Sequence, residues 1–304
     1  MNIHEEYREG KDINEQAMLA NIRITSWGGG ITDKQVSAEV AKRAGAQGRA
    51  QDVGYYNKRL LRRTAMKDIN RAGSDMRAVH YRYTMPWDDM GARLLPIGLH
   101  ERYVREMDEL IERRIAAKAE LVSDYSEHLD EARARLGSLF DAQDFPSAEQ
   151  LRDRITQEYH FSAVPTARHF AVESMNKDVQ SSIRKDIEER IAAKIQGSVV
   201  HLYERLYEVT GAVVERLGAE GESDNRIFRN SLLSNMQEVI ALVPALNLTG
   251  SSHLDEMAAK LGEAIDGIEP NQLRPNHKAF EAEKREQVKA AATDVQEQLA
   301  GYFG

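Results

Sequence analysis

The sequence predicts a mainly helical α+β fold. It contains two long antiparallel helices, together with additional helices and a small β-sheet. The first observation is composition: the chain has 304 residues, of which 41% are hydrophobic and 30% charged, as expected for helices with broad solvated faces. The second is a helical apolar stripe in each of two segments, 99–136 and 175–217. The third is the alternation of side chains at 20–27 and 79–85, which is typical of short strands.

We expect four parts along the chain. They are a flexible N-terminal arm at 1–16, a basic α+β region at 17–98, a long helical hairpin at 99–220 with a small insertion at 138–172, and a C-terminal helical region at 221–304. The arm is polar and has no apolar period, which indicates that it does not pack on the rest of the chain.

The basic region begins with a predicted strand, a turn and a helix. The strand covers 20–27 and ends at the glycine run 28–30. The sequence Thr32-Asp33-Lys34-Gln35 has the form of a capping box, which predicts that a helix begins there. Glycines at 45 and 48 interrupt that helix, and a second helix is predicted at 55–70, with basic side chains on both sides of its apolar stripe.

The clearest predicted strand is 79–85. Val79, Tyr81 and Tyr83 share one face with Met85, and the residues between them share the other. A turn at 86–91 follows, because Pro-Trp-Asp-Asp-Met-Gly is rich in turn-forming residues.

The first long helix is predicted from Leu99 to Leu136, since this stretch contains neither proline nor glycine. A helix of that length would run roughly 57 Å before Gly137 ends it. In the insertion, a short helix at 147–158 comes before two strands, 161–164 and 169–172, that pair around Pro165.

The second long helix is predicted at 175–217 and ends at Gly218. Three further helices follow at 227–243, 254–265 and 280–299, and Pro244 ends the first of them. We expect the sheet to collect strands near 20–27, 79–85 and 161–172.

The two long helices share a short sequence. Ile111–Lys118 reads IERRIAAK and Ile187–Lys194 reads IEERIAAK. The shared segment would mark equivalent levels of an antiparallel pair, while the alternative is that these residue types are simply common in helices.

Charge is distributed unevenly. Residues 31–84 hold twelve Lys or Arg against five acids, a balance of +7, so the rest of a chain whose net charge is −8 must carry −15. Such segregation indicates contact with a polyanion or with an acidic protein surface.

Most catalytic chemistries lack a candidate in this sequence. The absence of cysteine excludes disulfides, thiol nucleophiles and iron–sulfur clusters, and it suits a reducing cytoplasm. The glycine run before Lys34 does not match a nucleotide-binding P-loop. His160 and His169 have no evident carboxylate to orient them. We therefore expect no catalytic residues, no cofactor and no enzyme activity.

Metal binding is also not expected. His80 with Asp88 and Asp89 is one candidate group, and Asp124 with His128 at helical spacing is another. Each group lacks a further credible ligand, so the aspartates are interpreted as turn, cap or surface residues.

Aromatic residues interleave with the basic ones, which is typical of single-stranded nucleic-acid binding, where cations meet phosphates and rings stack on bases. The predicted contact residues are Lys58, Arg59, Arg62, Arg63, Lys67, Arg77, Tyr81, Arg82, Tyr83 and Trp87. The alternative is that Tyr81 and Tyr83 face the core and that the arginines pair with the acidic long helices of the same or another subunit.

The run from Tyr83 to Pro96, YTMPWDDMGARLLP, is followed by a long helix, by Leu136-Gly137, by Asp144-Phe145-Pro146 and later by Phe228-Arg229-Asn230-Ser231. Together these resemble an uncharacterised helical family of bacteriophage proteins, a domain of unknown function, over roughly residues 20 to 250. The resemblance implies that the protein is encoded near MoxR-type AAA+ ATPases and their von Willebrand-type partners in phage genomes, and that it is an adaptor or a remodelling substrate. It implies no active-site residues.

The sequence thus predicts a non-enzymatic, homo-oligomeric phage protein that binds nucleic acid, single-stranded DNA above all, in the cytoplasm of a bacterial host. The alternative is a protein-interaction adaptor or scaffold that works with a phage AAA+ ATPase and does not touch nucleic acid. No stretch approaches the roughly 18 continuous apolar residues of a membrane helix, so we expect a soluble, unprocessed chain without a membrane partner.

Overall fold

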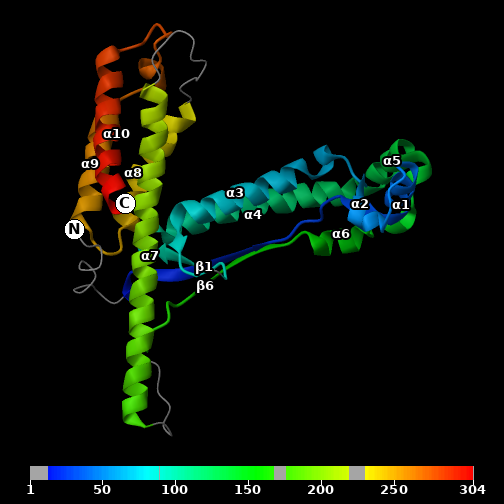
Figure 1. Cartoon of the computed structure of the whole chain (residues 1–304), viewed down its shortest axis with the longest axis horizontal. Helices are drawn as coiled ribbons and strands as arrows, with labels where there is room; N and C mark the ends of the chain where they lie inside the picture. The colour runs from blue at the N-terminus through cyan, green and yellow to red at the C-terminus, as the bar shows by residue number, and fades with distance from the viewer. Residues whose placement is uncertain (1–12, 89, 168–175, 219–229, 304) are drawn as a thin grey trace. The chain divides into compact units, whose positions relative to one another are not determined.

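The computed structural model describes residues 13–88, 90–167, 176–218 and 230–303 (Figure 1). It is mainly helical with a small antiparallel sheet, which confirms the predicted fold class. The chain forms two compact units. The first combines Met1–Asn21, Tyr83–Glu101 and Phe161–Gly304, and the second combines Ile22–Arg82 with Arg102–His160. Each unit therefore joins segments that lie far apart in the sequence.

The second unit is built on α3 (Lys67–Tyr83) and α4 (His100–Ser123), which lie side by side (Figure 1). At the far end of this pair are α5 (Tyr125–Leu136) and α6 (Ala148–Arg154). An apolar cluster fills the space where these helices meet, and burial of such side chains stabilises the unit. Its buried members are Trp27, Leu60, Leu61, Met66, Ile69, Leu121, Tyr125, Leu151 and Ile155.

Arg114 of α4 ties three segments of this unit together. Its side chain is fully buried and donates to the carbonyl oxygens of Ile69, Thr156 and Thr25 at 3.3, 2.8 and 2.6 Å. It also donates to Gln157 Oε1 and Ser26 Oγ at 2.6 and 2.7 Å. Every acceptor is neutral, so the guanidinium is solvated by the protein and not paired with a carboxylate.

The predicted strand at 79–85 is wrong, because α3 continues through it to Tyr83. Met76, Val79 and Tyr83 are buried at helical spacing, whereas Tyr81 is 55% exposed. A pair spaced by four residues satisfies both an alternating and a helical pattern, which is why the short run was ambiguous. The predicted helix at 55–70 is also wrong up to residue 66, since a strand and a 3-10 turn, Arg63–Met66, replace it.

The predicted continuous helix from Leu99 to Leu136 is wrong as well. It is two helices that meet at Asp124, whose φ and ψ of −90° and 9° leave the helical region. Next to this break Tyr125 is buried, and its hydroxyl donates to the Pro146 carbonyl at 2.7 Å. The contact with a distant loop thus accompanies a break that no proline or glycine announces. Gly137 ends α5 with φ of 53°, as predicted.

The first unit contains a bundle of four helices, α7 (Lys177–Gly218), α8 (Asn230–Leu246), α9 (Ser252–Ile265) and α10 (Ala282–Phe303). α7 packs against α8 and α10, and α9 packs against α8 and α10. In the predicted stripe of α7, buried residues occur only from Ile195 onward, and Val179 is 47% exposed. Pro244 lies inside the last turn of α8, so it does not end that helix as predicted.

Four strands form one sheet in the order β4-β5-β1-β6, namely β4 (Met85–Pro86), β5 (Arg93–Pro96), β1 (Ala17–Ile24) and β6 (Gln157–Ser162). β5 is antiparallel to both β1 and β4. β1 and β6 correspond to predicted strands with shifted boundaries, while the predicted strand 169–172 lies outside the described residues. Residues 1–12 of the predicted arm also lie outside the described ranges. Ile13, which the prediction included in the arm, is buried in a short 3-10 turn.

None of the helices in the described ranges combines the length and the apolar content needed to cross a membrane.

Candidate functional site

A small basic lobe, residues 30–63, extends the second unit beyond α3. It consists of β2 (Gly30–Asp33), α1 (Lys34–Arg43), α2 (Ala50–Val53), β3 (Tyr56–Arg59) and the turn that follows. β2 and β3 pair antiparallel, with Gly30 opposite Arg59 and Asp33 opposite Tyr56. The lobe therefore brings the two ends of a 30-residue stretch together as a hairpin base for α1 and α2.

The helix α1 is capped one residue later than the sequence predicted. Asp33 Oδ1 accepts the Val36 amide at 3.0 Å, which satisfies a free donor of the first turn. The hydroxyl of Thr32 donates instead to Asn57 Oδ1 across the hairpin at 3.0 Å. The predicted capping box is wrong because Thr32 belongs to β2 and has a cross-strand partner.

Lys58 is buried at the base of the lobe, where only 5% of its side chain is exposed. Its Nζ lies 3.0 Å from Asp33 and 2.6 Å from Asp144, and it donates to the Leu139 carbonyl at 3.0 Å. Burial alone would lower the pKa of Lys58, but Asp144 and Asp33 outweigh it and raise the pKa above its usual value. Lys58 was predicted to contact phosphate, and this enclosed position corrects that prediction.

Two of the predicted contact arginines are held by acidic side chains of the neighbouring helices. Arg62 forms an ion pair with Glu131 of α5, and Arg82 forms one with Glu106 of α4 at 3.1 Å. These pairs match the alternative prediction, in which arginines meet the acidic long helix of the same chain. Arg77 is exposed but also donates to the carbonyl of Gly73 at 3.3 Å.

Two of the predicted stacking rings are enclosed. Tyr83 is 1% exposed and Trp87 is 5% exposed, and the ammonium of Lys194 lies 5.1 Å from the centre of the Trp87 ring. A base cannot stack on a ring that the fold already covers. The predicted stacking of bases on Tyr83 and Trp87 therefore does not fit the structure. Tyr81 remains exposed, as the predicted contact requires.

The remaining predicted cations, Arg59, Arg63 and Lys67, are exposed, and four further cations of the lobe are exposed as well. The exposed cations of the basic lobe are Lys34, Lys42, Arg43, Arg49, Arg59 and Arg63. Within the described ranges, the side chains of these six make neither an ion pair nor a hydrogen bond. These six side chains therefore carry the unpaired positive charge of the basic lobe.

Two exposed rings were missed as site residues. Tyr55 and Tyr56 are 65% and 38% exposed and lie just before Arg59 in the chain. The helix predicted at 55–70 included both residues and is wrong here, because β3 begins at Tyr56. The available signal was local: two β-prone tyrosines directly after Gly54 favour a short strand that begins at a turn.

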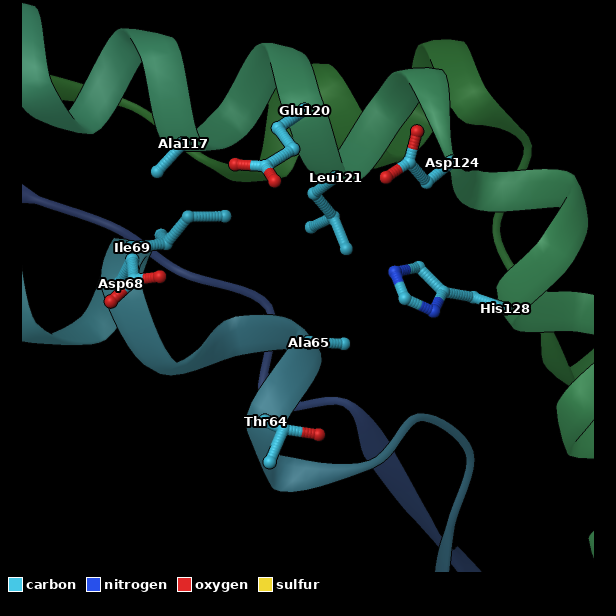
Figure 2. A pocket seen from close by; sticks show the side chains of 9 residues that line it. All are labelled: Thr64, Ala65, Asp68, Ile69, Ala117, Glu120, Leu121, Asp124 and His128. Atoms are coloured by element: carbon cyan, nitrogen blue, oxygen red, sulfur yellow. The ribbon is translucent and has the colours of Figure 1, made fainter.

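A separate cavity of about 260 Å³ opens between α3, α4 and α5 in the second unit. Asp68, Glu120, Asp124 and His128 line it over an apolar floor that includes Leu121. Figure 2 shows Asp124 and His128 on the same side and Asp68 on the opposite side. The predicted Asp124–His128 pair thus shares one cavity with two further carboxylates, Glu120 from α4 and Asp68 from α3. In the part of the chain that the structure describes, no three His, Asp or Glu side chains have an arrangement that would hold a metal ion.

Comparison with known proteins gives no relative: no family model, no curated protein and no solved structure matches this chain.

Proposed function

We propose that the chain binds single-stranded nucleic acid through the basic lobe. The observation that carries the proposal is the coexistence of six exposed, unpaired cations with the exposed rings of Tyr55 and Tyr56 in one small lobe. Guanidinium and ammonium groups meet phosphates, and tyrosine rings stack on bases with little sequence preference.

The charge of the lobe supports a local contact with a polyanion. Residues 30–63 contain eight Lys or Arg and three acids, a balance of +5 in a chain whose net charge is −8. One of the three acids, Asp33, already neutralises Lys58. The positive potential is therefore concentrated on the lobe, where it would attract a strand and orient it.

A protein-interaction adaptor is the second candidate, and one observation favours it. Val40 of α1 and Val53 of α2 are 54% and 50% exposed, and these two helices pack against each other. Exposed aliphatic side chains contribute little to phosphate or base contacts but are used at protein interfaces. An AAA+ ATPase is one such partner, and assembly into a homo-oligomer is another use of the same surface.

A salt titration separates the two candidates. Fluorescence anisotropy of a labelled oligothymidylate would be measured with the full chain at increasing salt, starting from about 50 mM. The proposal expects binding that weakens steeply with salt, with a slope of roughly −0.7 per phosphate contact. An adaptor without a nucleic-acid role predicts no binding at any of these concentrations, and that result would overturn the proposal.

Charge-removal variants test the location. The triple variant Lys42→Ala, Arg43→Ala, Arg49→Ala removes three of the lobe's cations and should weaken binding by a factor of about ten or more. The control triple variant Arg105→Ala, Arg113→Ala, Arg152→Ala removes three exposed cations of α4 and α6 with the same change in charge. Equal losses in the two triple variants would show that overall charge, and not the lobe, determines binding.

A further inference from the structure

A pocket of about 280 Å³ lies on the hairpin of the basic lobe. Gly28, Gly30 and Thr32 line one side, and Asn57 and Arg59 line the other. We infer that this pocket is a subsite for one phosphate group, held by Arg59 beside the open glycine backbone. The inference rests on the proposed function and adds to it a defined place where the strand is fixed.

The glycine run supplies a wall without side chains. A Cβ atom at Gly28 would meet nothing within 4 Å, so the backbone there is open to a ligand. Gly29 has φ of 64°, a left-handed conformation that glycine adopts without strain. Among the described residues, the amides of Gly28 and Gly29 have no hydrogen-bond acceptor. Gly28 is exposed and lines the pocket, so its free amide is available to an anion, whereas Gly29 is buried and does not line the pocket.

The opposite wall supplies the positive charge. Arg59 is exposed and its guanidinium has no partner in the described ranges, while its carbonyl accepts from Arg135 Nη1 at 3.1 Å. A guanidinium can bind two phosphate oxygens at once, which fixes the orientation of the group. Thr32 donates its hydroxyl to Asn57 Oδ1 across the hairpin at 3.0 Å, which leaves the side-chain NH₂ of Asn57 as a donor beside the pocket.

The shape of the hairpin depends on the last glycine of the run. A Cβ atom at Gly30 would lie 2.9 Å from the Lys58 carbonyl oxygen, too close for any other residue to keep this pairing. Gly30 therefore sets the geometry of the pocket, and Gly28 is the position at which the pocket can be altered without disturbing the hairpin. This difference allows a clean test.

The test places a negative charge in the pocket and compares it with the same charge elsewhere on the lobe. Gly28→Asp puts a carboxylate where the phosphate is expected, and no atom lies within 4 Å of a Cβ atom at this position. Gly54→Asp is the matched control, because Gly54 is also exposed, also has free space around it and does not line the pocket. Circular dichroism and thermal melting would confirm that both variants fold.

We expect Gly28→Asp to weaken oligothymidylate binding about tenfold or more and Gly54→Asp less than about threefold, since both add one charge but only the first occupies the subsite. Gly28→Ala should bind nearly as the unaltered chain does. If the two aspartate variants lose affinity equally, the subsite is wrong while the proposed function stands.

A second arm identifies the source of the phosphate. Thymidine 5′-monophosphate would be titrated into the full chain and both aspartate variants by isothermal calorimetry. If the unaltered chain binds no oligonucleotide, the proposed function fails. In that case, if the unaltered chain and Gly54→Asp bind the monophosphate but Gly28→Asp does not, the pocket is a site for a free nucleotide. If neither ligand binds, or if Gly28→Asp changes neither, the phosphate subsite is overturned.

Discussion

The ammonium nitrogen of Lys58 lies 2.6 Å from Asp144 Oδ2, and this ion pair fastens the basic lobe to the short 3-10 turn Ala142–Asp144 that follows α5. Asp33 completes the group from the other strand of the hairpin at 3.0 Å. One buried cation thus pairs with two carboxylates, that of Asp33 in β2 and that of Asp144, which lies far away in the sequence. Lys58, which the sequence assigned to ligand binding, instead holds the lobe in place.

Replacement of Lys58 should destabilise the chain. Lys58→Met keeps much of the side-chain volume but leaves Asp33 and Asp144 as neighbouring carboxylates with little solvent, which costs about 3–5 kcal/mol of unfolding free energy. Urea denaturation followed by circular dichroism measures this loss. Lys67→Met, at an exposed position, is the control and should change stability by less than about 0.5 kcal/mol. Similar stability of the two variants would contradict a structural role for Lys58.

The same group predicts a pH dependence on the acid side. The Val36 amide and then Lys58 lower the pKa of Asp33 below its usual value of 3.8. A carboxyl with a depressed folded-state pKa contributes stability above its unfolded pKa and loses it as pH falls through the folded value. The stability difference between the unaltered chain and Asp33→Asn should therefore be constant at neutral pH and shrink below about pH 4. A difference that stays unchanged to pH 2 would contradict this assignment.

Arg114 and Arg190 offer a matched pair, because they occupy the same place in the two similar octapeptides. Arg114 is buried and donates to five neutral acceptors, whereas Arg190 is exposed and pairs with Asp186 of its own helix at 3.0 Å. Arg114→Lys should cost about 3 kcal/mol of unfolding free energy, since several carbonyls lose their donor. Arg190→Lys should cost less than about 0.5 kcal/mol. Thermal or urea unfolding of both variants measures the contrast, and equal effects would refute it.

The same octapeptides show what helix composition can and cannot predict. Both segments are helical, as their residue types favour. The environments of the two arginines differ because that of Arg114 is set by Ile69 of α3 and by Thr25 and Thr156, which lie far away in the sequence. Periodicity and composition thus predicted the helical state of both long segments and the end of α5 at Gly137, but not the break at Asp124.

The errors lie where a short pattern has two solutions or where a distant contact decides. Val79 and Tyr83 fit both a strand and a helix, and packing in the folded chain selects the helix. At the candidate site, the count of basic residues located the region, but it could not separate the enclosed Lys58 from the free Arg59 beside it. Adjacent residues of a strand point to opposite faces, and only the register of β2 and β3 assigns those faces.

The exposed tyrosines give the last prediction. Tyr55→Ala with Tyr56→Ala removes both exposed rings of the lobe without altering its charge, and each lost base stack should cost about 1–3 kcal/mol of oligothymidylate binding. Trp87→Phe is the matched control, because Trp87 is enclosed and lies outside the lobe. It should leave the affinity unchanged while lowering thermal stability, since a smaller ring leaves a cavity. Anisotropy titrations paired with thermal melts measure both effects. If the tyrosine variant binds as tightly as the unaltered chain, the rings do not stack on bases, and the lobe would be left with phosphate contacts alone.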